Sequence, residues 1–203
     1  NMYDQKGCLS PHCIYVNPKE QPRSFAARLA KSLDLLNKNT PPKGRDIATD
    51  AQTLGYQSIW TVEATGTDAL TMLGAVSQAA PNLDLGTGIV PVQIRTPALA
   101  AMSAATLQAL NPDVDVWLGV GVSAPGILSQ HGMPTTDKPI GMMREYVALF
   151  RECLSGESVT FEGDYFQTKR FRLGMRLGER KPKIVMAALN PQTVSYTHLR
   201  AHE

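Results

Sequence analysis

Short apolar segments alternate with helix-length segments rich in Ala and Leu between residues 58 and 188, and this rhythm limits the fold more than any other feature. It begins with a strand pattern at 58–62, a helical pattern at 68–80 and an apolar run at 83–90. Strand, helix and strand in this order predict a βαβ unit, whose functional loops follow the carboxyl ends of its strands. The loop residues after these two strands are therefore the first candidates for a site.

The same alternation continues along the chain. The expected elements are a helix at 98–110 opened by Pro97, a strand at 115–121, a loop containing Pro125, Gly126, Gly132 and Pro134, a helix at 139–154, a hairpin with strands at 158–161 and 165–168, and a strand at 183–188. Repeated βα units predict a parallel sheet, either doubly wound or closed as a barrel. A full eight-fold barrel needs about 250 residues, and about four parallel strands are recognisable here.

Charge and composition exclude several classes of function. Lys and Arg total 20 against 18 Asp and Glu, a balance that favours binding neither to nucleic acid nor to a membrane surface. No apolar run approaches the roughly 20 residues of a spanning helix, and the first residues lack the apolar core of a signal peptide. Three cysteines are too few and too scattered for a disulfide framework. A cytoplasmic protein is expected.

Several motifs in register resemble the luciferase-like monooxygenases, in the branch of deazaflavin (coenzyme F-420)-dependent oxidoreductases. They are Gly55-Tyr-Gln-Ser-Ile-Trp60, Glu63-Ala-Thr-Gly-Thr-Asp-Ala69, Leu85-Gly-Thr-Gly-Ile89, Arg95-Thr-Pro97, Leu118-Gly-Val-Gly-Val-Ser123 and Val159-Thr-Phe-Glu-Gly163, within residues 44–194. The resemblance implies an α/β fold, here an incomplete (β/α)8 TIM barrel with about four parallel strands and a β-hairpin insertion. It also implies coenzyme F-420 or FMN, hydride transfer to or from a small organic substrate, and a homodimer.

The resemblance also assigns cofactor-binding residues. Gly88-Ile89 falls where the family has a non-proline cis peptide bond, in a bulge behind the flavin or deazaflavin ring. Glycine there removes a side chain where a planar ring must approach the backbone. The residues expected to contact the cofactor are Glu63, Thr87, Gly88, Ile89, Gly121, Val122 and Ser123. Asp68 is expected to cap the following helix.

Two other features of this region are only weak indications of function. Gly119, Gly121 and Ala124 satisfy the spacing of a dinucleotide-binding fingerprint. Pro125-Gly126 does not resemble the immediate helix start that this fingerprint requires, so we expect the end of a barrel strand instead. His131 is interpreted as a loop residue and not as a catalyst.

The two ends of the chain do not follow the alternation. In the segment 1–42, Tyr3-Asp-Gln-Lys-Gly-Cys-Leu-Ser-Pro11 resembles the active-site segment of long-chain acyl-CoA reductases, and this resemblance implies Cys8 as a thioester-forming nucleophile with NADPH as the cofactor. Spacing alone favours a small buried Cys beside a turn. Cys8, His12 and Cys13 lack the second ligand pair of a metal site, so no metal is expected. Residues 195–203 resemble translated adapter sequence and are expected to be unstructured.

Three functions therefore remain open from the sequence. The first is a flavin- or deazaflavin-dependent oxidoreductase whose partial barrel occupies residues 43–194. The second is an acyl-CoA reductase fragment that uses Cys8. The third is a non-functional fused and truncated product with exposed strand edges, and the sequence favours this outcome for the isolated 203-residue chain.

Overall fold

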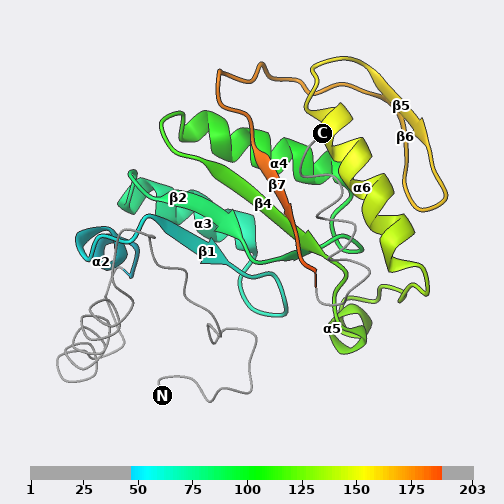
Figure 1. Cartoon of the computed structure of the whole chain (residues 1–203), viewed down its shortest axis with the longest axis horizontal. Coiled ribbons are helices and arrows are strands. Elements are labelled where there is room, and N and C mark those ends of the chain that lie inside the picture. The colour runs from blue at the N-terminus through cyan, green and yellow to red at the C-terminus, as the bar shows by residue number, and fades with distance from the viewer. Residues whose placement is uncertain (1–46, 189–203) are drawn as a thin grey trace. The chain divides into compact units, whose positions relative to one another are not determined.

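The computed structural model describes residues 47–188, which are coloured in Figure 1. The chain divides into two compact units, Asn1–Ile47 and Ala48–Glu203, and the description below concerns the second. The predictions made for residues 1–42 and 195–203, including those for Cys8, His12 and Cys13, lie outside the described residues. Within 47–188, no helix combines the length and apolar character needed to cross a bilayer.

From residue 58 onward the main strands and helices follow the predicted order, whereas the helix at Ile47–Thr53 was not predicted. In chain order they are α2 (Ile47–Thr53), β1 (Ser58–Thr61), α3 (Ala69–Ala79), β2 (Asp84–Thr87), β3 (Val90–Pro91), α4 (Pro97–Leu110), β4 (Val116–Gly121), α5 (Pro125–Gln130), α6 (Pro139–Cys153), β5 (Val159–Glu162), β6 (Gln167–Phe171) and β7 (Lys183–Met186).

Side-chain caps determine where the two central helices begin. The Thr71 N–H donates to Oδ1 of Asp68 at 2.7 Å, so the predicted cap of α3 is confirmed. The Leu99 N–H donates to Oγ1 of Thr96 at 3.3 Å, and Pro97 occupies the first helical position of α4. Both caps satisfy N–H groups that have no partner inside their helix.

The strands form one parallel sheet in which neighbours follow the order of the chain (Figure 1). β1 pairs with β2, β2 and β3 pair with β4, and β4 pairs with β7. Among the described residues, β1 and β7 each pair on one side only, so this sheet is open. The antiparallel hairpin of β5 and β6 is separate. The expected α/β fold with four parallel strand paths and a hairpin insertion, a partial barrel, is confirmed.

One face of the sheet carries the core. Side chains from alternate strand positions pack against α3, α4 and α6, including Ile59, Leu85, Val116, Leu118 and Val120 from the sheet and Leu73, Leu107, Tyr146 and Phe150 from the helices. Because side chains along a strand alternate between faces, Trp60 and Trp117 point to the opposite face. Trp60 is 46% exposed there.

The predicted strand at 83–90 was wrong as one continuous element. β2 pairs with β4 through Leu85 and Gly86, and β3 pairs with β4 through Val90 and Pro91. Between these pairs, residues 87–89 of the first path lie opposite only residues 118 and 119 of β4. One extra residue makes a β-bulge, which divides the run into two strands.

Two further predictions need correction. The loop expected at 125–134 contains the six-residue helix α5, which Pro125 opens after an extended Ala124. The second hairpin strand begins at Gln167 and not at Tyr165, because the carboxylate of Glu145 on α6 accepts the N–H groups that precede it. Asp164 and Tyr165 donate to Glu145 at 2.9 Å and Phe166 donates at 3.2 Å.

Candidate functional site

The bulge between β2 and β3 lies at the carboxyl edge of the sheet and presents its middle residue to the outside. Gly88 is exposed, whereas Thr87 and Val90 on either side of the bulge are buried. The peptide bond between Gly88 and Ile89 is cis, as the family resemblance predicted. The N–H of Gly88 donates to the carbonyl of Thr61 at 2.7 Å, so the bulge is attached to the end of β1.

A threonine hydroxyl closes the gap that the bulge leaves in the sheet. Oγ1 of Thr87 accepts the N–H of Gly119 at 2.8 Å and donates to the carbonyl of Gly119 at 2.9 Å. It therefore replaces the backbone partners that β4 loses beside the bulge. Position 119 must be glycine, because a Cβ there would overlap the carbonyl oxygen of Thr87.

Four of the predicted residues meet at this edge. The N–H of Glu63 donates to the carbonyl of Ile89 at 3.1 Å, which joins the end of β1 to the bulge. A methyl group on Gly121 would lie 3.4 Å from Cδ1 of Ile89 and 3.1 Å from Cβ of Ala187, so glycine brings β4 close to both neighbours. The carboxyl ends of β1, β2, β4 and β7 thus converge around Gly88 and Ile89.

Two carboxylates that share one guanidinium support this edge. The Nε of Arg95 donates to both carboxylate oxygens of Glu63 at 2.9 Å, and its Nη2 donates to Asp68. The Glu63 side chain is only 8% exposed, so pairing with Arg95 offsets the cost of its burial. Partial burial would raise the pKa of Asp68, but the hydrogen bonds from Thr71 and the Arg95 charge lower it below its ordinary value.

Arg95 was missed as a functional residue, although its Arg95-Thr-Pro97 motif was part of the resemblance. Glu63 and Arg95 are 32 residues apart, and no local period pairs them. Their meeting is a consequence of neighbouring strands ending at one edge. The sequence signal that could have revealed this pair was an acid after one strand and a cation after the next.

The remaining predicted residues lie after β4. Val122 packs partly against the main core. Ser123 is half-buried, and its hydroxyl makes no hydrogen bond to another described residue. Gly119 and Gly121 lie inside β4 and not in a turn, so the dinucleotide fingerprint is not formed even though α5 begins at Pro125.

His131 has a structural contact in the same region. Its Nε2 lies 2.5 Å from the carbonyl oxygen of Ala64, which connects the end of α5 to the loop after β1. This contact agrees with its interpretation as a loop residue. Within residues 47–188, no three His, Cys, Asp or Glu side chains gather as metal ligands would.

Trp60 is the second residue that the sequence analysis missed. It pairs in register with Gly86, and any Cβ on Gly86 would overlap its indole ring. A Cβ on Gly88 would lie 3.9 Å from the same ring. The half-exposed indole therefore lies over Gly86 of β2 and next to Gly88 of the bulge, on the open face of the sheet.

Two buried polar side chains lie near these elements without a protein partner. Both amide atoms of Gln93, in the loop after β3, and the hydroxyl of Tyr146 on α6 lack a hydrogen-bond partner among the described residues. Burial raises the pKa of Tyr146. The Arg95 charge acts in the opposite direction, and the Glu63 charge raises the pKa further.

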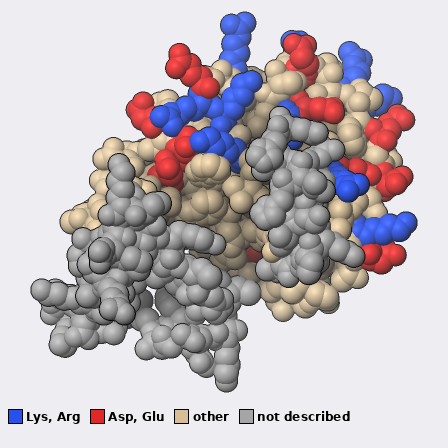
Figure 2. All heavy atoms as spheres, in the orientation of Figure 1, with Lys and Arg blue, Asp and Glu red and all other residues tan. Residues whose placement is uncertain are grey.

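Figure 2 shows where charged side chains gather in one view of the molecule. Lys and Arg are interspersed with Asp and Glu along the upper and right-hand margins, whereas uncharged residues form most of the described surface near the centre. At the bulge itself, an exposed glycine lies beside the half-exposed indole of Trp60, and a surface of this kind suits a planar organic group.

Comparison with known proteins assigns this geometry to a family. The model of the luciferase-like monooxygenases matches residues 22–202. The match extends past both ends of the 44–194 range on which the resemblance rested.

Curated relatives agree with this match. A protein of Mycobacterium tuberculosis named as a coenzyme F-420-dependent oxidoreductase is 30% identical over 141 residues, which are 69% of this chain and 40% of the relative. A protein of Kineococcus radiotolerans named F-420-dependent glucose-6-phosphate dehydrogenase is 30% identical over 168 residues, which are 77% of this chain and 49% of that protein. The chain thus spans less than half the length of these relatives.

Solved structures show the same fold. An F-420-dependent secondary alcohol dehydrogenase in complex with an F-420–acetone adduct superposes with a TM-score of 0.67 at 23% identity, covering 76% of this chain and 52% of that one. A monooxygenase from Streptomyces bottropensis gives a TM-score of 0.65 at 22% identity, covering 76% and 49%. None of these relatives supports the acyl-CoA reductase alternative.

Proposed function

Because this chain belongs to the luciferase-like monooxygenase family, we propose that the carboxyl edge of its sheet binds the ring of coenzyme F-420 or FMN. The proposed activity is hydride transfer to or from a small organic substrate. Relatives named for coenzyme F-420 support the deazaflavin as the first choice. When bound, the cofactor supplies the hydride chemistry, and the protein supplies position, hydrogen bonds and shielding from water.

The arrangement of the bulge is the single observation that carries this proposal. A planar ring needs a surface without protruding side chains, and Gly88 is exposed at the point where Glu63, Ile89 and Gly121 converge. A Cβ at Gly121 would crowd Ala187 at 3.1 Å and Ile89 at 3.4 Å, and glycine keeps this neighbouring strand end free of a side chain. The residues present therefore fit the cofactor that the family uses.

Each predicted residue then has a defined part. Gly88 and Ile89 form the surface behind the ring, and Gly121 with Val122 extends it. The hydroxyl of Ser123 makes no hydrogen bond to another described residue. This hydroxyl would donate to a carbonyl or phosphate oxygen of the cofactor. Thr87 uses its hydroxyl within the sheet, so it positions Gly88 and does not contact the ring.

Glu63 and Arg95 hold the edge in place. Arg95 pairs with the Glu63 carboxylate and also with Asp68, so it orients the strand end and offsets one of the two negative charges beside the ring. The substrate is proposed as a small organic molecule. The homodimer and the cytoplasmic location expected from the sequence remain predictions, and sedimentation and cell fractionation would check them.

A fluorescence titration tests the proposal. Wild-type chain is titrated with coenzyme F-420 and, separately, with FMN, and each Kd is compared with that of Gly88→Val. The variant places two methyl groups on the open face without a backbone clash, because the nearest atom to a Cβ there is 3.9 Å away. We expect its Kd to rise at least about tenfold, a loss of about 1.4 kcal/mol of binding free energy.

Gly178→Val is the matched control, since Gly178 lies in an exposed loop with no atom within 4 Å of a Cβ. It should bind as the wild type does. The proposal fails if neither cofactor binds the wild-type chain up to about 1 mM, or if Gly88→Val and Gly178→Val bind equally well.

A further inference from the structure

The chain segment before β7 carries an unusual concentration of positive charge. Between residues 169 and 183 there are seven Lys and Arg side chains and a single acid, Glu179. They are Lys169, Arg170, Arg172, Arg176, Arg180, Lys181 and Lys183. A run of this kind on an otherwise balanced chain is the largest local imbalance in the described region.

Part of this charge is already compensated. Nη1 of Arg180 lies 2.9 Å and Nζ of Lys183 lies 2.5 Å from the two carboxylate oxygens of Asp115. Lys183 also lies over the ring of Trp117, 4.4 Å from its centre. These two cations therefore serve to attach the start of β7 to β4.

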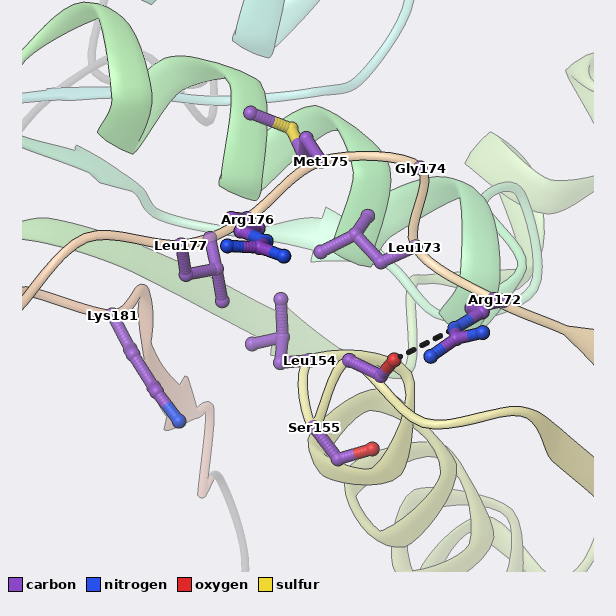
Figure 3. Close-up of a pocket in the computed structure, with 10 residues that line it drawn as sticks. Leu154, Ser155, Arg172, Leu173, Gly174, Met175, Arg176, Leu177 and Lys181 are labelled. Carbon is purple, nitrogen blue, oxygen red and sulfur yellow. Dashed lines mark hydrogen bonds between the residues drawn. The ribbon is translucent and has the colours of Figure 1, made fainter.

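Three of the other cations line one pocket of about 480 Å³ (Figure 3). Arg172, Arg176 and Lys181 surround a floor made by Leu154, Leu173 and Leu177. No acidic residue is among the described residues that line this pocket. The combination of a cationic rim and an apolar floor is typical of a site for an amphiphilic anion.

The rim cations are free to bind such an anion. Arg172 donates through Nε to the carbonyl of Gly156 at 3.1 Å, which holds the guanidinium at the rim and leaves its terminal nitrogens for another acceptor. Arg176 and Lys181 form no ion pair with any residue in the described part of the chain. Three like charges around one cavity repel each other, and an anion between them would relieve this repulsion.

We propose that this pocket binds a phosphorylated small molecule that carries an apolar group. Guanidinium groups match the oxygens of a phosphate through paired N–H donors, and Lys181 adds a point charge. The leucine floor would cover the apolar part of the ligand. The volume lies in the range of small-molecule sites, about 300–1,000 Å³.

The pocket is separate from the proposed cofactor site. The loop that supplies Arg176 and Lys181 leads into the amino end of β7 at Lys183, whereas Gly88 lies beyond the carboxyl end of β2 (Figure 1). A ligand in the pocket would therefore occupy the opposite edge of the sheet, where it would join the end of α6 to the loop before β7.

Calorimetric titration of the full chain with n-hexyl phosphate tests this proposal. Inorganic phosphate and n-hexanol are titrated in parallel, because the first carries only the phosphate group of the probe and the second only its apolar chain. We expect n-hexyl phosphate to bind most tightly, inorganic phosphate more weakly, and n-hexanol not measurably. Added salt should weaken the binding, because the rim charges are exposed and screened within about 10 Å at 0.1 M ionic strength.

The double variant Arg176→Gln/Lys181→Gln should raise the Kd for n-hexyl phosphate at least about tenfold. Lys138→Gln/Lys169→Gln removes the same charge from exposed positions outside the pocket and should change the Kd less than about twofold. Arg172→Gln probes the same rim independently. Circular dichroism checks that each variant folds.

The proposal is overturned if n-hexyl phosphate does not bind the wild-type chain, or if n-hexanol binds equally well. It is also overturned if the pocket variants bind as the wild type does, or if the control double variant loses affinity to the same extent.

Discussion

Replacing Thr87 by Val tests how the sheet accommodates the bulge that presents Gly88. Valine has nearly the shape of threonine but no hydroxyl. The substitution therefore removes both hydrogen bonds to Gly119, at 2.8 and 2.9 Å, while it keeps the packing of a side chain that is completely buried.

The size of the effect comes from the two backbone groups left behind. The N–H and the carbonyl of Gly119 would both remain buried beside the bulge without a partner on that side. An unsatisfied buried group costs about 1–3 kcal/mol. Some relaxation is expected, because a carbonyl with a free lone pair is tolerated more often than a free N–H. We therefore expect the free energy of unfolding to fall by about 2–4 kcal/mol.

Urea unfolding followed by circular dichroism measures this change from the midpoint and slope. Thr106→Val is the matched control, because Thr106 is exposed on α4 and its hydroxyl contacts only the carbonyl of Met102 at 2.8 Å and, more distantly, the sulfur of Met175 at 4.0 Å. Its unfolding free energy should stay within about 0.5 kcal/mol of the wild type. If Thr87→Val also changes by less than about 0.5 kcal/mol, the hydroxyl does not complete the sheet and our account of the bulge is wrong.

Three further predictions concern other parts of the chain. Glu145→Gln should lower the unfolding free energy by about 1–3 kcal/mol and speed hydrogen exchange at amides 164–166, since its carboxylate accepts all three; exposed Glu157→Gln should do neither. Hydrogen bonding from Lys183 and Arg180, against slight burial, holds the pKa of Asp115 below its usual value. That stabilisation is complete above pH of about 4 and is lost as pH falls through the lowered pKa, so Asp115→Asn should flatten acid unfolding curves below pH of about 4. Burial and Glu152 raise the pKa of Cys153 to about 11, so iodoacetamide at neutral pH should label this residue in urea but not in the folded chain.

Local patterns predicted much of the fold. The alternation of apolar and helical segments located the strands and helices, because each element depends on the period of its own residues. Asp68 was recognised as a helix cap because capping requires only a short polar side chain three residues before an N–H. The cis bond at Gly88-Ile89 was predicted only through the family resemblance, since no period or turn signal marks it.

Long-range pairings were not predictable in the same way. Glu63 with Arg95 and Thr87 with Gly119 are each separated by 32 residues. Both depend on the single extra residue between β2 and β3, which sets how the two strand paths align with β4. A bulge of one residue leaves the hydrophobic period almost unchanged, so periodicity predicted a continuous strand there, and only the family resemblance indicated a bulge.

The sequence by itself therefore determined the order of elements, the α/β class and the family. Only the tertiary structure decided which side chains meet. It joined Gly88, Ile89, Glu63 and Gly121 at one edge, and it gathered Arg172, Arg176 and Lys181 around one pocket at the other. The physical reason is that periodicity reports how one segment is buried, whereas contacts between segments depend on strand register and on loop paths that no single segment encodes.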